Sequence, residues 1–192
     1  RSIFPFEDID YQQARKLGLF EYPDIVLYDQ NPVLGLKIPK NQEKAMRWLN
    51  GYYGERKQFR VFVLFFTNKP EEIVEKQRSY WQGGNKNELV VCVGIDKNKN
   101  VKWCNAFSWC DSPVVGVKSR DWFMSNPVNL EKYAEYIGPI VEKEWRRKNF
   151  EDFDYLTIEL TDGQYWAIII LLLIFNIGMS FWIVTNNYKN DL

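Results

Sequence analysis

The run FRVFVLFF, Phe59–Phe66, holds a single polar residue, Arg60, among aliphatic and aromatic side chains. Its eight residues are too few for a buried helix, and their β-branched and aromatic content favours a strand. A strand that is apolar on both sides is typical of the centre of a sheet with both faces covered. The run therefore predicts a central, doubly buried strand.

A helix is predicted on each side of this strand. Residues 41–54 (NQEKAMRWLNGYYG) have helical periodicity, with Asn41 as the cap and Gly54 as the stop. The predicted apolar stripe of this helix consists of Ala45, Trp48, Leu49, Tyr52 and Tyr53. Residues 68–84 (NKPEEIVEKQRSYWQGG) predict a second helix, with a capping box made by Asn68 and Glu71 and a stop at two glycines.

A β-hairpin is predicted next. Residues 88–96 (ELVVCVGID) and 101–109 (VKWCNAFSW) have strand character and are joined by KNKN. Alternation along the second strand predicts one face made of Val101, Trp103, Asn105, Phe107 and Trp109. If the turn centres on Asn98, Cys92 lies opposite Cys104, either as a strained disulfide or, as we favour, as two packed thiols.

The ends of the soluble part are less regular. Residues 1–40 predict an extended N-terminal arm with one short helix, capped by Asp8 and ended by Gly18, that packs on its own domain or on a neighbour. Residues 112–116 predict a loop, and residues 129–148 a helix that kinks or splits at its Gly-Pro pair.

The predicted fold class is therefore an α+β or α/β sandwich on a mixed sheet, covering residues 41–160. FDYLTIEL, Phe153–Leu160, is expected to end it as a strand or an extended stalk.

The stretch from Trp48 to Trp109 resembles the TPM domain, a small α/β module often tethered by a C-terminal transmembrane helix. The resemblance lies in WLNGYYGERKQFRVFVLFF, YWQGGNKNELVVCVGID and KNKNVKWCNAF, taken in that order. It implies a TPM-like fold, and with it a membrane-tethered phosphatase or metal-binding domain as an alternative function. Asp111 would be the central residue of that site, with Asp121 and Glu88 as companions.

A transmembrane helix is predicted at residues 165–185, followed by a short polar tail at 186–192. Residues 166–184 are uncharged, and at about 1.5 Å per residue they span roughly the hydrocarbon core of a bilayer. The expected membrane-interface anchors are Tyr165, Trp166, Trp182 and Tyr188.

Polar and small residues interrupt this span. Asn176 and Ser180 lie four residues apart and share a helix face, and Gly178 would let a neighbour approach closely. We expect these three residues to contact another membrane helix; the alternative is that Asn176 bonds its own backbone or a water.

The composition gives no indication of catalysis, metal binding or nucleic-acid binding. Lys+Arg and Asp+Glu balance at 25 each, so nucleic-acid binding is not expected. The chain has no histidine to act as a base or a metal ligand, and no phosphate-binding loop or C-x-x-C. We therefore expect no enzyme activity, cofactor, metal site or small-molecule substrate.

The predicted function is a non-catalytic accessory, structural or assembly subunit of a larger membrane protein complex, with other membrane subunits and the lipid bilayer as partners. A start at Arg1 in a Lys- and Asn-rich chain favours a mitochondrial inner-membrane respiratory complex. A viral membrane protein is a further alternative. A binding receptor is another alternative. Its aromatic face would consist of Trp103, Phe107 and Trp109 and would contact a soluble ligand.

Overall fold

The computed structural model describes residues 6–23, 31–149 and 162–190, without the side chains of 187–190. The chain divides into two compact units, Ser2–Asp152 and Phe153–Leu192. In the described residues, the first is an α+β domain and the second holds one long helix, α6 (Asp162–Asn190). The predicted strand at residues 153–160 lies outside the described residues.

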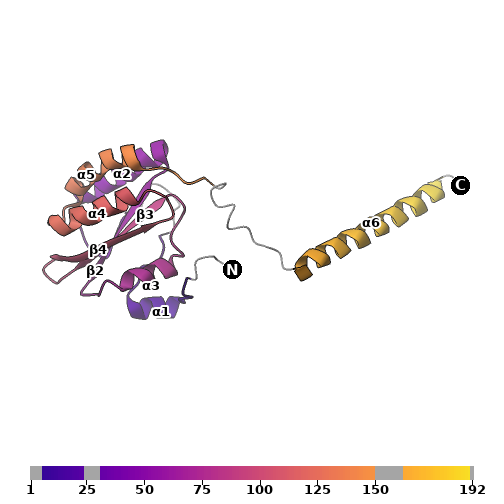
Figure 1. Ribbon diagram of the computed structural model, residues 1–192, viewed down its shortest axis with the longest axis horizontal. Coiled ribbons are helices and arrows are strands. Elements are labelled where there is room, and N and C mark those ends of the chain that lie inside the picture. Colours follow the sequence, from indigo (N-terminus) through magenta and orange to yellow (C-terminus); the bar gives the residue numbers. More distant parts are fainter. Residues whose placement is uncertain (1–5, 24–30, 150–161, 191–192) are drawn as a thin grey trace. The chain divides into compact units, whose positions relative to one another are not determined.

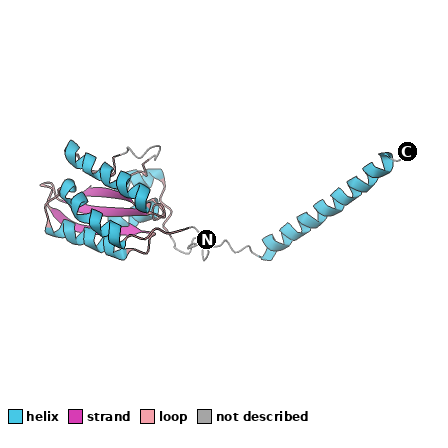
Figure 2. Cartoon of the chain, turned by 90° about the horizontal axis from the view of Figure 1, so that it is seen from above, coloured by secondary structure: helices cyan, strands magenta, loops and turns pink. Residues whose placement is uncertain are grey.

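A four-stranded mixed sheet forms the centre of the first unit (Figures 1 and 2). Its strands follow the order β1 (Val33–Leu34), β2 (Arg60–Thr67), β3 (Glu88–Ile95) and β4 (Val101–Ser108). The first three are mutually parallel, and β4 runs antiparallel to β3. Six of the eight β2 residues and all of β3 are buried, which confirms the doubly buried central strand.

Helices cover both faces of the sheet (Figure 1). They are α1 (Tyr11–Leu17), α2 (Lys40–Lys57), α3 (Ile73–Tyr80), α4 (Pro113–Ser125) and α5 (Leu130–Glu144). α2, α4 and α5 lie on one face, and α1 and α3 on the other. Because side chains alternate along a strand, β2 sends Val61, Val63 and Phe65 into one core and Phe62, Leu64 and Phe66 into the other.

The described part of the N-terminal arm packs on its own domain, which is one of the two alternatives given above. Phe20 is held at its backbone: its N–H donates to Gln77 Oε1 at 2.9 Å, and its carbonyl accepts from Gln77 Nε2 and Trp81 Nε1 at 3.0 and 2.7 Å. The arm also supplies β1, so the sheet begins before residue 41. The short helix ends at Gly18 as predicted, but its cap is Asp10, in a capping box with Gln13, and not Asp8.

Two predicted helix starts are wrong. α2 has Pro39 at its N-cap, while Asn41 instead donates to Glu131, and the helix continues past Gly54 to Lys57. α3 begins at Ile73 without a side-chain cap. Asn68 has a left-handed φ of 53°, and its N–H donates to the Ile95 carbonyl at 2.8 Å. It therefore shapes the turn after β2 and cannot cap a helix.

The apolar stripe of α2 is rotated from the predicted one. Its buried residues are Met46, Leu49, Asn50 and Tyr53. Trp48 and Tyr52 are 60% and 39% exposed and stack on each other with ring centroids 4.9 Å apart. The stripe was broad enough for two helix orientations, and packing against β2 and α5 selects the one that exposes this aromatic pair.

The loop predicted at residues 112–116 is in fact the start of α4. Pro113 stands in its first turn, where a missing N–H costs nothing. Burial of Val115, Ser119, Trp122 and Phe123 follows the helical period. The helix was missed because small residues at its start resemble a turn.

α5 starts after Asn129 as predicted but continues through Gly138–Pro139 as one helix. A Cβ on Gly138 would lie 3.2 Å from Tyr53 Oη. The glycine therefore allows α2 and α5 to pack closely; it does not split the helix.

The hairpin register differs from the predicted one by a residue. Near the turn, Ile95 pairs with Val101, but an irregularity between Gly94 and Ile95 shifts the register, so Cys92 faces Asn105 and Val93 faces Cys104. A one-residue shift moves a side chain to the other face. Cys92 and Cys104 accordingly lie in different cores as free thiols, and Val101 lies on the opposite face from Trp103.

Candidate functional site

The second unit contains the most apolar helix of the described chain. Within Asp162–Asn186 of α6, the most apolar window of 18 residues has a mean hydropathy of 2.6 and contains no buried residue. By length and composition, α6 could therefore cross a membrane. Of the predicted anchors, Tyr165, Trp166 and Trp182 are exposed, and the Tyr165 and Trp166 rings meet edge to face at 6.3 Å. Tyr188 lies in α6, but its side chain is outside the described residues.

The polar and small residues in the middle of α6 do not all lie on one face of the helix. Asn176 and Ser180 lie one turn apart on one face of the helix. Gly178 is two residues from each, which is about 200° around an α-helix, so it lies on the opposite side. Asn176 Nδ2 donates to the Leu172 carbonyl at 2.8 Å. That bond uses one N–H and leaves the other N–H and the carboxamide oxygen for a neighbour.

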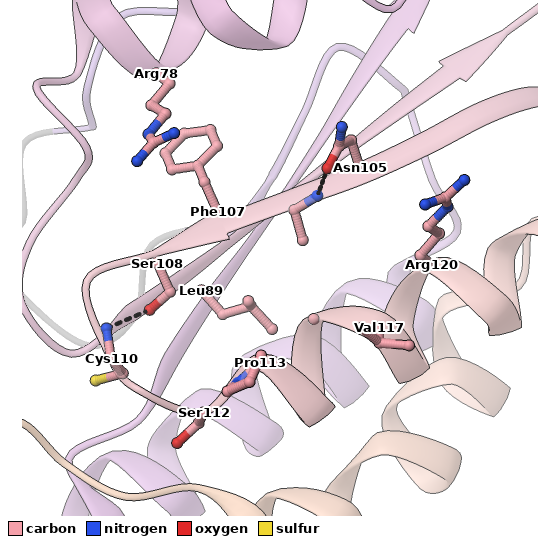
Figure 3. A pocket seen from close by; sticks show the side chains of 12 residues that line it. Arg78, Leu89, Asn105, Phe107, Ser108, Cys110, Ser112, Pro113, Val117 and Arg120 are labelled. Carbon is pink, nitrogen blue, oxygen red and sulfur yellow. Dashed lines mark hydrogen bonds between the residues drawn. The ribbon is translucent and has the colours of Figure 1, made fainter. Parts of the chain in front are cut away.

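A pocket of about 360 Å³ opens along β4, the edge strand of the sheet in the described chain (Figure 3). Its walls come from α3, β4, the segment after β4, and the first turns of α4. The lining residues include Arg78, Asn105, Phe107, Ser108, Val117 and Arg120.

Half of the backbone groups of β4 face this pocket and not the sheet. The Ala106 N–H is bonded to the side-chain oxygen of Asn105 at 2.8 Å, so it points away from β3. Since backbone direction alternates along a strand, the N–H and C=O groups of Cys104 and Ser108 also point outward. No further strand pairs with β4 on this side among the described residues. β4 therefore presents an open edge to the pocket.

Arginines are the charged residues that line the pocket. Arg78 comes from α3 and Arg120 from α4, so they flank β4 from opposite faces of the sheet. Arg78 has a loose ion pair with Glu75 at 3.9 Å, and Arg120 has no ion-pair partner among the described residues. The charged residues of the pocket lining are thus both positive, which sequence analysis missed because the two arginines are 42 positions apart on different helices.

Cys110 borders the pocket but is not an activated nucleophile. Burial raises the pKa of its thiol, with smaller opposing effects from hydrogen bonds, so the thiol is protonated at neutral pH. Burial also raises the pKa of Cys104, to about 12. This protonation argues against thiolate chemistry at either residue.

The carboxylates suggested by the TPM resemblance have separate structural roles. Asp111 is exposed and accepts from Lys148 Nζ at 3.1 Å, and Asp121 is an exposed residue of α4. Glu88 is 4% exposed and accepts from Tyr22 Oη at 2.6 Å. No group of three or more His, Cys, Asp or Glu that could hold a metal occurs among residues 6–23, 31–149 and 162–190.

The predicted aromatic face of the second hairpin strand is packed and not displayed. Trp103 stacks on Phe66 with centroids 6.1 Å apart, and its Nε1 donates to the Lys69 carbonyl at 2.8 Å. Phe107 is 8% exposed, and Trp109 Nε1 donates to the Gly84 carbonyl at 3.1 Å. These contacts leave no aromatic stripe for a receptor.

Comparison with protein-family models, with curated proteins and with solved structures found no match to this chain. A function must therefore be inferred from the residues of the chain itself.

Proposed function

We propose that this chain is a non-catalytic, single-pass membrane protein that serves as an accessory or assembly subunit of a larger membrane complex. α6 would anchor the domain and pair with a helix of another subunit. A respiratory complex of the mitochondrial inner membrane is the assembly that we expect.

The single observation that carries this proposal is Asn176 in the middle of α6. An exposed carboxamide on an apolar helix has a strong preference for a partner when the surroundings are lipid. Hydrogen bonds of this kind contribute about 0.6–2 kcal/mol to helix association in membranes. Ser180, one turn further on the same face, can add a second bond or allow a close approach.

A tethered phosphatase or metal-binding domain is less well supported. Asp111 forms an ion pair with Lys148, and Glu88 accepts a hydrogen bond from Tyr22. The described residues contain no group of three or more His, Cys, Asp or Glu that could hold a metal ion. We therefore favour a role in assembly.

The test is association in the native membrane. The double variant Asn176→Leu, Ser180→Leu should still insert, because it makes α6 more apolar, but should lose co-migration with the complex on native electrophoresis after mild-detergent extraction. Thr185→Val is the matched control. It removes a hydroxyl that already bonds the Phe181 carbonyl at 2.9 Å and lies about 180° around the helix from Asn176.

If the wild-type chain migrates at about its own mass, or the double variant co-purifies as the wild type does, the subunit proposal is wrong. Mass spectrometry of the wild-type band would name the partners and the membrane.

A further inference from the structure

The open edge of β4 and the two arginines beside it carry an inference that is independent of α6. We propose that this edge binds an extended acidic segment of a partner protein by strand addition, with two carboxylates three residues apart held by Arg78 and Arg120.

The backbone geometry supplies the first argument. Added strands bind through main-chain hydrogen bonds to an exposed sheet edge, and pockets for alternate side chains provide specificity. β4 offers the outward groups of Cys104, Ala106 and Ser108, and the pocket lies along this stretch. Asn105 caps only the N–H of Ala106, so its side chain must swing aside when a strand is added.

Charge supplies the second argument. The two charged residues of the pocket lining are both arginines, so an acidic segment is the complementary occupant. An arginine can also hold a carboxylate through two parallel hydrogen bonds, which fixes its position.

The position of each arginine sets the spacing of the carboxylates. Directly paired residues of neighbouring strands have side chains on the same face. Phe107 points to the α3 face, where Figure 3 places Arg78 beside its ring. Cys104 points to the α4 face, and Arg120 of α4 lines the pocket together with Asn105 and Ala106, the two residues that follow Cys104. The partner residues that pair with Phe107 and Cys104 therefore meet one arginine each, and they are three positions apart.

The two residues between these carboxylates have different surroundings. The one paired with Ala106 faces α4, where Pro113 and Val117 provide an apolar wall, so a small apolar residue fits there. The one paired with Asn105 faces Glu71, which accepts from Asn105 Nδ2 at 3.2 Å, so an acidic residue is excluded. The expected core is Glu-Val-Thr-Glu for an antiparallel addition and Glu-Thr-Val-Glu for a parallel one.

The test uses the full chain in nanodiscs of zwitterionic lipid and two fluorescent octapeptides, each with one of these cores between pairs of threonines. Fluorescence anisotropy should show saturable binding of at least one of the two peptides, with a Kd below 1 mM. This Kd corresponds to a binding free energy of about 4 kcal/mol. Replacing both glutamates by glutamine should weaken binding about 4- to 25-fold, from two partly exposed ion pairs. Raising the salt concentration should also weaken it.

N-methylation separates strand addition from simple charge attraction. Methyl groups on the amides that face β4 should weaken binding more than about 10-fold, whereas methyl groups on the opposite edge of the peptide should have little effect.

Variants of the protein complete the test. Arg78→Gln and Arg120→Gln should each weaken binding about 2- to 5-fold. Arg15→Gln on α1, away from the pocket lining, is the matched control. The proposal is overturned if neither peptide binds, if the glutamine peptides bind as tightly, or if methylation of either edge has the same effect. None of these results would affect the proposal for α6.

Discussion

Replacement of Asn50 should destabilise the domain more than its place on a surface helix suggests. Asn50 is 5% exposed, its Nδ2 donates to the Val61 carbonyl at 3.0 Å, and its Oδ1 accepts from the Val61 N–H at 2.8 Å. Among the described residues, β1 pairs with β2 at Val63 and Leu64 and does not reach Val61. The Asn50 side chain thus takes the place of a strand at the end of β1.

The magnitude follows from the two bonds. Asn50→Leu leaves a buried N–H and a buried C=O without partners, at about 1–3 kcal/mol each. Extra apolar burial by leucine offsets about 1–2 kcal/mol of this. We expect a net loss of about 1–4 kcal/mol in the free energy of unfolding. Urea unfolding of the chain in nanodiscs, followed by tryptophan fluorescence, measures it.

Asn50→Asp adds a pH test of the same bonds. An ionised carboxylate at this position could accept from the Val61 N–H but could not donate to the carbonyl, and burial would raise its pKa above that in the unfolded chain. The folded state then binds the extra proton, so the loss is largest at neutral pH and shrinks as the pH falls through the raised pKa. Asn41→Leu, at an exposed position of α2, is the control. A loss below about 1 kcal/mol for Asn50→Leu would refute the reasoning.

Two further predictions concern the hairpin. Hydrogen bonds from Asn100 lower the pKa of Asp96 to about 2, so its contribution to stability is present above the unfolded pKa of about 4 and is lost as the pH falls towards 2. Unfolding measured between pH 7 and pH 2 should show Asp96→Asn less stable than wild type at neutral pH, with the gap closing in acid; a gap that does not depend on pH would contradict this. Cys92 and Cys104 should remain reduced after treatment with a thiol oxidant and should react with a thiol reagent only on unfolding, because they lie in separate cores and burial raises both pKa values. A mass loss of two hydrogen atoms in the folded chain, traced to a disulfide between these cysteines, would show that the register is wrong.

Some of these features could be predicted because they depend on local pattern alone. The apolar run Phe59–Phe66 has no polar face, so burial on both sides is the one arrangement that removes it from water. The helix at residues 41–54 and the hairpin at 88–109 follow from periodicity in the same way. The apolar length of α6 likewise appears directly in the sequence.

Other features depend on which elements meet, and local pattern does not contain that information. The irregularity beside Gly94 shifts the residue paired with Cys92 from Cys104 to Asn105. Cys104 therefore lies on the opposite face of the sheet from Cys92. Asn50 looks like any polar helix residue until Val61 is found beside it. Arg78 and Arg120 line one pocket because α3 and α4 pack on opposite faces of β4.

The sequence by itself thus determined the sheet-forming runs, most of the helices and the apolar helix at the end of the chain. Each of these follows from how a short segment avoids exposing apolar surface to water. The tertiary structure decided the register, the orientation of α2 and the meeting of two arginines at the edge of β4. Those depend on packing and hydrogen bonds between residues far apart in the chain, such as Asn50 with Val61 and Phe20 with Gln77.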